Sequence, residues 1–68
     1  MKIRAYIERE RRDRVVEVKE KSSVADVLEA LGINPVTVIV TKNNEMVTEN
    51  HVLQGNDKVK VISVVSGG

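Results

Sequence analysis

The sequence contains no cysteine, phenylalanine or tryptophan, and it has one tyrosine and one proline. Without cysteine the chain forms no disulfide, offers no thiolate to a metal and carries no cysteine nucleophile, so we expect a protein of the reducing cytoplasm. No apolar run has the length of a membrane helix, and the start of the chain lacks the apolar block of a secretion signal. The 11 basic and 10 acidic side chains nearly cancel, so bulk charge predicts no general attraction to nucleic acid or membrane.

The chain is instead rich in valine, isoleucine and leucine. Its length of 68 residues predicts one small domain, with residues 1–66 as the body and residues 67–68 as a flexible C-terminal tail. Hydrophobic residues make up 41% of the chain, and because most of them are aliphatic and many are β-branched, the core is expected to be built largely from strands.

Alternation of apolar and polar residues predicts two strands near the start of the chain, over residues 2–8 and 14–19, with Val16 and Val18 pointing inward on the second. The charged segment 9–13 between them is the turn of a hairpin. Later β-branched runs predict strands over residues 36–41 and 58–65, and a short strand at residues 46–47 lies between the turns at 42–45 and 54–57.

One segment has helical rather than alternating periodicity. Val24, Val27, Leu28 and Leu31 recur with the spacing of one helix face, Ser22 and Ser23 precede them, and Gly32 follows. The element order is therefore two strands, a helix and three strands. The economical packing lays the helix across a mixed sheet in which the first and last strands are neighbours, which is the α+β class and the β-grasp arrangement of ubiquitin.

The chain ends on Gly67 and Gly68, directly after the last predicted strand. Two residues without a Cβ make a slender peptide that fits a narrow cleft, and its tip is a free carboxylate held out by a packed strand. A carboxylate is a poor acyl donor until it is activated. The chain has no phosphate-binding loop and no nucleophile with a base beside it, so it is expected to be a substrate and not a catalyst.

The helix segment 23–32, the turn 54–57 that leads into residues 58–62, and the ending 65–68 together resemble the ubiquitin-related sulfur carriers, the ThiS/MoaD-like and small archaeal modifier-like family. The resemblance implies that a partner enzyme related to ubiquitin-activating enzymes adenylates Gly68 with ATP and magnesium, and that the adenylate becomes a thiocarboxylate. Ser66 and Gly67 would form the tail. A sulfur-transfer or acceptor protein is the second implied partner, and the carrier itself binds no cofactor.

The resemblance leaves the pathway and the fate of the carboxylate open. Thiamine thiazole formation and tRNA thiolation are favoured over molybdopterin synthesis, because Val64 and Val65 stand where MoaD-like tails often carry prolines. The first alternative is a ubiquitin-like modifier that is joined to lysines through Gly68. The second alternative is a non-covalent interaction domain whose terminal glycines are incidental.

Counting the alternation outward from the core places Tyr6, Ile39 and Ile62 on the sheet face opposite the helix. An apolar centre with a polar rim is common at protein interfaces, so these residues, flanked by Arg4, Lys58 and Lys60, form a candidate partner-binding patch on a protein that we expect to be a monomer.

Two other features are given structural roles. Five arginines gather around the first hairpin, but acidic residues interleave with them and no set of aromatic residues accompanies them, so a solvated hairpin is favoured over nucleic-acid binding. His51 is interpreted as a hydrogen-bonding loop residue, and no metal is assigned, because the chain has no second histidine and no cysteine.

Overall fold

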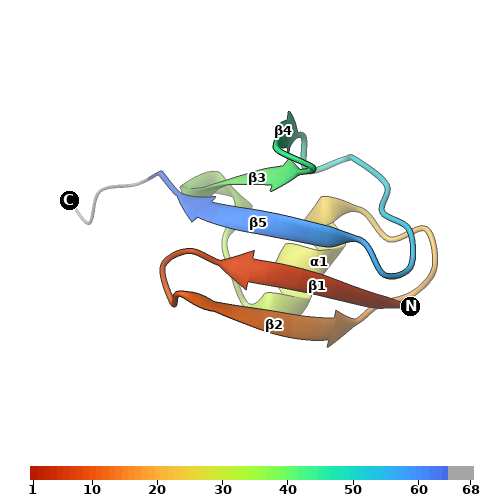
Figure 1. The fold of residues 1–68 in the computed structure, drawn as a ribbon. Coiled ribbons are helices and arrows are strands. Elements are labelled where there is room, and N and C mark those ends of the chain that lie inside the picture. The colour runs from red at the N-terminus through yellow and green to blue at the C-terminus, as the bar shows by residue number, and fades with distance from the viewer. Residues whose placement is uncertain (65–68) are drawn as a thin grey trace.

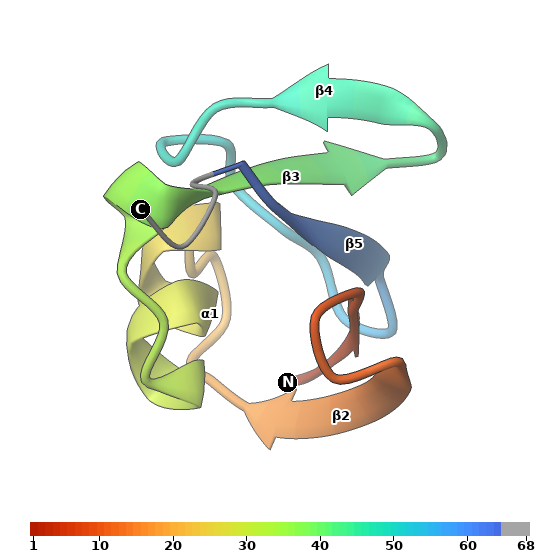
Figure 2. The same ribbon diagram turned by 90° about the vertical axis from the view of Figure 1, so that its left-hand side faces the viewer.

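The computed structural model describes residues 1–64. The strands are β1 (Lys2–Ile7), β2 (Arg12–Glu17), β3 (Val38–Lys42), β4 (Glu45–Val47) and β5 (Lys58–Ser63). They form one sheet in the order β2-β1-β5-β3-β4, in which β1 and β5 are parallel and the other neighbours antiparallel. Helix α1 (Val24–Leu31) lies across one face of this sheet (Figure 1, Figure 2). The structure confirms the predicted α+β class, the β-grasp arrangement and the pairing of the first strand with the last.

The core lies between α1 and the face of the sheet that we call the inner face. Alternate residues of β1 point into it, and Ile3 and Ala5 are fully buried there, as the period of two requires. The other buried apolar side chains come from β1, α1, β3, β5 and the loop before β5: Ile7, Val24, Val27, Leu28, Leu31, Val40, Leu53, Val59 and Val61. Val16 and Val18 are partly buried against this core, so both point inward as predicted.

Both ends of α1 are capped by the residues that the sequence indicates. The hydroxyl of Ser23 accepts a hydrogen bond from the backbone N–H of Asp26 at 3.4 Å, and the Asp26 carboxylate accepts one from the N–H of Ser23 at 2.9 Å. Gly32 ends the helix in the left-handed conformation, with φ at 74°, which glycine adopts without steric cost. The predicted bounds of the helix are therefore confirmed.

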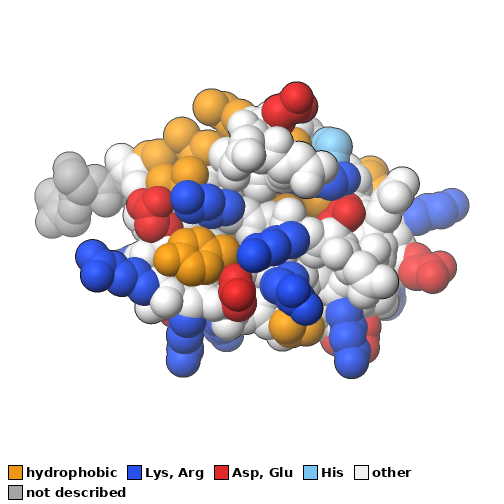
Figure 3. Space-filling view, viewed as in Figure 1, with side chains coloured by type: hydrophobic (Ala, Val, Ile, Leu, Met, Phe, Trp, Pro, Cys, Tyr) orange, Lys and Arg blue, Asp and Glu red, His pale blue; other side chains and the backbone are white. Residues whose placement is uncertain are grey.

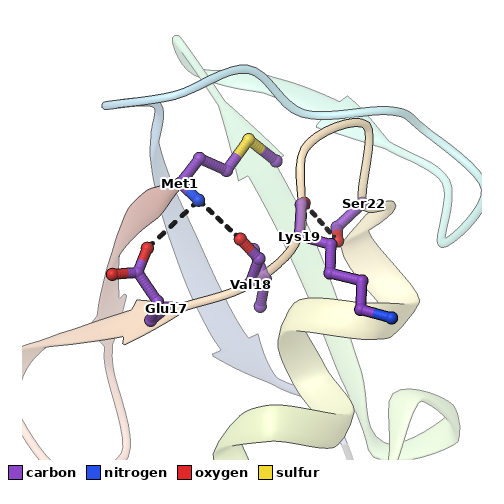
Figure 4. Close-up of polar contacts among 5 residues, drawn as sticks. All are labelled: Met1, Glu17, Val18, Lys19 and Ser22. Carbon is purple, nitrogen blue, oxygen red and sulfur yellow. Dashed lines mark hydrogen bonds and ion pairs between the residues drawn. The ribbon is translucent and has the colours of Figure 1, made fainter.

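The end of β2 is fastened to the start of the chain. The α-amino group of Met1 donates a hydrogen bond to the carbonyl oxygen of Val18 at 2.6 Å and lies 3.1 Å from Oε2 of Glu17 (Figure 4). Further on, the hydroxyl of Ser22 donates to the carbonyl oxygen of Lys19 at 2.6 Å. These contacts hold the connection through which the chain passes from the sheet to α1.

The first hairpin is tighter than predicted, and β2 starts at Arg12 and ends at Glu17 instead of running over residues 14–19. Arg11 adopts the left-handed conformation, with φ at 54°, and its N–H donates to the carbonyl oxygen of Ile7 at 2.8 Å. Because this turn reverses the chain at once, Arg12 already pairs with Ile7. The turn was predicted to be longer because residues 9–13 are all charged and show no alternation of apolar and polar residues.

The prediction of a strand over residues 36–41 is wrong at its start. Pro35–Thr37 form a short 3-10 helix, and β3 begins at Val38. The side-chain oxygen of Asn34 accepts a hydrogen bond from the N–H of Val36 at 3.0 Å, and the hydroxyl of Thr37 donates to the Asn34 carbonyl at 2.8 Å. Local capping by an Asn-Pro pair therefore prevails over the β propensity of the residues that follow.

The turn between β3 and β4 is confirmed, and its geometry explains the two asparagines. Asn43 and Asn44 both have positive φ, at 54° and 66°, and Lys42 pairs with Glu45 on either side of them. A two-residue hairpin loop with this conformation matches the right-handed twist of the flanking strands, and asparagine tolerates it well. The short strand that follows includes Glu45 as well as residues 46–47.

Candidate functional site

The predicted reactive tail of Ser66, Gly67 and Gly68, with Val65 before it, lies outside the described residues. What the structure describes is the point from which it leaves. β5 ends at Ser63, and the N–H of Val64 donates to the carbonyl oxygen of Thr37 at 3.0 Å. β5 lies between β1 and β3, its pairing with β1 ends at Val61, and its last residues pair with β3 alone, so the chain leaves the sheet from its central strand.

The start of β5 is set by a polar cluster that sequence reasoning missed. Oδ2 of Asp57 accepts a hydrogen bond from the N–H of Gln54 at 2.7 Å and lies 3.1 Å from Nζ of Lys42 on β3. The carbonyl oxygen of Asp57 accepts from the N–H of Arg4 at 3.0 Å, which begins the parallel pairing of β1 with β5. The turn itself was recognised, but nothing in the sequence links Asp57 to Lys42.

The charges around Asp57 favour its ionised form. Partial burial raises the pKa of this carboxyl, but the hydrogen bond from Gln54 and the contact with the Lys42 ammonium outweigh that effect, and the charge of His51 acts in the same direction. The pKa of Asp57 is therefore held below its ordinary value of 3.8. The turn is accordingly fastened by a charged contact at neutral pH.

The face of the sheet away from α1, which we call the outer face, carries the five residues of the predicted partner-binding patch. Ile39 pairs with Ile62 across β3 and β5, and Tyr6 pairs with Lys60 across β1 and β5. Tyr6 and both isoleucines are partly exposed, whereas Lys58 and Lys60 are exposed. The register therefore separates the patch into an apolar pair, Ile39 and Ile62, and a second group in which Tyr6 lies beside the lysines.

A shallow hollow of about 420 Å³ lies beside this second group. Its walls come from Tyr6, Lys58 and Lys60 on the two central strands and from the Asn43 and Asn44 turn. Nζ of Lys60 is 6.0 Å from the centre of the Tyr6 ring. Figure 3 shows lysine and arginine side chains gathered over the middle of this face, and hydrophobic side chains collected toward the end from which the chain leaves β5.

The remaining candidates fit structural roles. Glu10 lies between Arg12 and Arg14, at 3.1 and 3.9 Å, so acidic side chains do interleave with the arginines of the hairpin. His51 lies in the loop before β5, where its backbone carbonyl accepts a hydrogen bond from the backbone N–H of Val24, and its Nε2 is buried without a partner among the described residues.

Residues 1–64 contain no group of three side chains that could hold a metal ion. None of their helices is long and apolar enough to cross a membrane.

Solved structures of other proteins share this fold. A ubiquitin-like sheet with one helix is shared by SAMP1 from Haloferax volcanii, whose crystal structure superposes with a TM-score of 0.78 at 20% identity and full coverage of both chains. A ubiquitin from Caldiarchaeum subterraneum superposes with a TM-score of 0.72 at 19% identity, over 100% of this chain and 98% of that one. At these identities the likeness establishes the fold alone.

The family follows from sequence. The model of the ThiS family matches residues 3–68. The chain is 40% identical to the sulfur carrier protein TtuB of Thermus thermophilus over 53 residues. The matched region covers 78% of this chain and 82% of TtuB. An uncharacterized protein of Archaeoglobus fulgidus is 50% identical over 44 residues, which is 65% of this chain and 64% of that protein. The chain therefore belongs to the ThiS family of sulfur carriers, and the prediction of a carrier protein instead of an enzyme is confirmed.

Proposed function

We propose that the carboxylate of Gly68 is the group that carries sulfur. A carboxylate oxygen attacks the α-phosphorus of ATP and pyrophosphate leaves, which gives an acyl adenylate. The outer sulfur of a persulfide on the partner then attacks the acyl carbon and AMP leaves, which gives an acyl disulfide. A thiol cleaves the S–S bond of this acyl disulfide, which frees the Gly68 thiocarboxylate and leaves a disulfide on the partner. These steps take place on a partner enzyme related to ubiquitin-activating enzymes, which supplies ATP and magnesium. We place the reaction in the cytoplasm, where ATP is available.

The observation that carries this proposal is the extent of the family match, which runs to Gly68 itself. The geometry at the start of the tail supports it, because β5 is held between β1 and β3 and fastened at Val64. We propose that residues 1–66 form the body of the carrier and that the last two glycines enter the active-site cleft of the partner. Glycine suits this role because it has no side chain to obstruct a narrow channel.

For the pathway that receives the sulfur, we propose two candidates. Thiolation of tRNA and formation of the thiamine thiazole are both consistent with the Val64 and Val65 ending, and molybdopterin synthesis is the less favoured pathway. We also propose that Tyr6, Ile39 and Ile62, with Lys58 and Lys60, contact the partner enzymes. The support for this contact is that the register places all five residues on one face of the sheet.

The direct test is mass spectrometry of the intact chain after incubation with the activating enzyme of the same organism, ATP, magnesium and a sulfur donor. We expect a product in which one oxygen has been replaced by sulfur, and none when ATP is left out. A matched control is the chain lacking Gly67 and Gly68, which retains every described residue. Absence of the sulfur-containing product from the complete reaction would contradict the proposal.

The alternative fate as a protein modifier begins from the same acyl adenylate, so it needs a separate test. Attack by a lysine amine on the adenylate would join Gly68 to a lysine of another protein. Because the last trypsin site of the chain is Lys60, digestion would leave residues 61–68 as a branched remnant on that lysine. Peptide sequencing of cell extracts that contain the tagged carrier detects such remnants. The two-glycine deletion also tests the interaction-domain alternative, since a deleted chain that still complements a carrier-deficient strain would show that the glycines are incidental.

A further inference from the structure

The neighbouring strands β1 and β5 carry positive charges opposite each other, an arrangement that does not stabilise the fold. Arg4 on β1 lies directly opposite Lys58 on β5, and Lys60 follows on the same face. Like charges opposite each other destabilise a pair of strands. None of the three cations forms an ion pair with another described residue, so no carboxylate of residues 1–64 offsets the repulsion between Arg4 and Lys58. We call Arg4, Lys58 and Lys60 the basic strip.

The basic strip borders two concave regions of the outer face. The hollow of about 420 Å³ beside Tyr6 lies on one side of Lys58, and Lys60 contributes to its wall. A second hollow of about 440 Å³ includes Arg4 and Lys2 and lies on the other side of Lys58. Lys58 lines both. Carboxylate side chains from a partner would thus meet cations from more than one side, which is the arrangement that electrostatic complementarity requires.

The basic strip and the apolar pair lie in line along β5. β5 passes from Lys58 through Lys60 to Ile62, so at a rise of about 3.3 Å per residue Lys58 and Ile62 are about 13 Å apart. The apolar pair is at the end from which the tail leaves. A partner that matches charge at one end and apolar surface at the other can bind the carrier in only one orientation, with the tail directed to one side.

We propose that the basic strip docks on an acidic surface of the activating enzyme, with enzyme carboxylates entering the two hollows while the apolar pair packs beside the entrance for the tail. This inference rests on the proposed function. Charge attraction acts at a distance, so the strip accelerates encounter and fixes orientation, whereas the apolar pair prolongs the bound state.

A nucleic-acid partner fits this face less well than an acidic protein does. Asp13 and Glu17 of β2 lie opposite Tyr6 and Lys2 on the same face, so phosphates along β2 would be repelled. Tyr6 is the single aromatic residue of the chain, and therefore no row of stacking side chains accompanies the cations. An apolar pair next to charged residues is instead typical of protein interfaces, which have an apolar core and a polar rim.

The variant K58E separates docking from folding. It replaces a like-charge pair with an opposite-charge pair across β1 and β5, so we expect its melting temperature to equal or exceed that of the wild type. Its association rate with the activating enzyme, measured by stopped-flow or surface-binding kinetics at low salt, should fall about tenfold, with little change in the dissociation rate. The wild-type rate should decline as salt is added, and the K58E rate should depend on salt much less.

The matched control is K19E, which makes the same change of charge in the connection beside α1, away from the outer face (Figure 4). An association rate for K58E equal to that of the wild type, or a decrease no larger than that of K19E, would overturn the proposal. So would a K58E variant that binds the enzyme normally but loses affinity for bulk tRNA in a mobility-shift assay.

The same experiment distinguishes failure of this inference from failure of the proposed function. The chain lacking Gly67 and Gly68 has no Gly68 to be adenylated, but it retains the basic strip and is expected to bind the enzyme with the sensitivity to K58E described above. Formation of the thiocarboxylate with docking insensitive to K58E would reject the basic strip alone. Docking that depends on Lys58 without any thiocarboxylate would reject the proposed function and leave the surface established.

Discussion

The two faces of the sheet differ in the side chains that they carry, although the same strands supply both faces. On the inner face every buried side chain of β1 and β5 is aliphatic, and these residues include Ile3 and Val61. On the outer face the same two strands place Arg4 opposite Lys58. The inner face is what the hydrophobic effect selects in a small domain. The outer face tolerates a repulsion between like charges that a partner of opposite charge would relieve, and this difference between the two faces is the basis of the docking role that we propose for the basic strip.

The largest expected effect of a substitution belongs to the inner face. Leu28 of α1 is 2% exposed, and L28A removes apolar contacts and leaves a cavity, so we expect a loss of about 2 to 5 kcal/mol in the free energy of unfolding. In a domain of this size that is a large part of the total stability. Urea unfolding followed by circular dichroism measures the loss. The matched control is A30G, and a loss for L28A no larger than that of this exposed helix position would contradict the assigned core.

The next effect tests the turn at the start of β5. The pKa of Asp57 is lower in the folded protein than its ordinary value of 3.8, so the charged contact with Lys42 contributes stability above that value. This contribution is lost as the pH falls through the still lower pKa of the folded state. We expect D57N to cost about 1 to 3 kcal/mol at neutral pH, because Lys42 and the N–H of Gln54 lose a charged acceptor.

The measurement is urea unfolding of wild type and D57N over a pH series from about 7 to about 2. The difference between the two proteins should shrink on the acid side, because protonation of Asp57 removes the same charge that the variant lacks. D13N, on the exposed outer face, is the control. A constant difference between wild type and D57N at every pH would show that the charge of Asp57 is not the source of the effect.

A smaller change in stability, with a clear effect on binding, is expected for the apolar pair. Ile39 and Ile62 are only partly buried, so I39A and I62A should each cost about 1 kcal/mol or less in the free energy of unfolding. Their effect on the complex with the activating enzyme should be a faster dissociation rate, because truncation of interface side chains acts mainly on that rate. Binding kinetics at high salt would isolate this contribution, and an unchanged dissociation rate would remove the pair from the docking surface.

The smallest effect is expected for the ion pair between Met1 and Glu17 at the edge of the outer face. The Glu17 side chain is 68% exposed, and solvent screens such a pair strongly. E17Q should therefore change the free energy of unfolding by about 0.5 kcal/mol or less, and added salt should remove the difference. Thermal unfolding at low and high salt measures it. A loss comparable with that of L28A would mean that the two faces do not differ as described.

Much of the architecture was predictable because it depends on local periodicity. The spacing from Val24 to Leu31, with Ser23 before it and Gly32 after it, defines the helix through contacts within one segment. The start of β3 was misplaced because the hydrogen bonds of Asn34 compete with strand formation, and propensity does not weigh such side-chain capping. The hairpin turn was placed too long for a similar reason, since nothing in the sequence marks the left-handed conformation of Arg11.

The sequence by itself determined the order of elements, the inner-face residues and the terminal glycines, because each depends on neighbouring residues or on the end of the chain. Only the tertiary structure decided that Lys58 stands opposite Arg4 and that Asp57 contacts Lys42. These pairs join residues that are distant along the chain, and their distances are set by strand register. Register in turn follows from the packing of every strand against one core, which no single segment encodes.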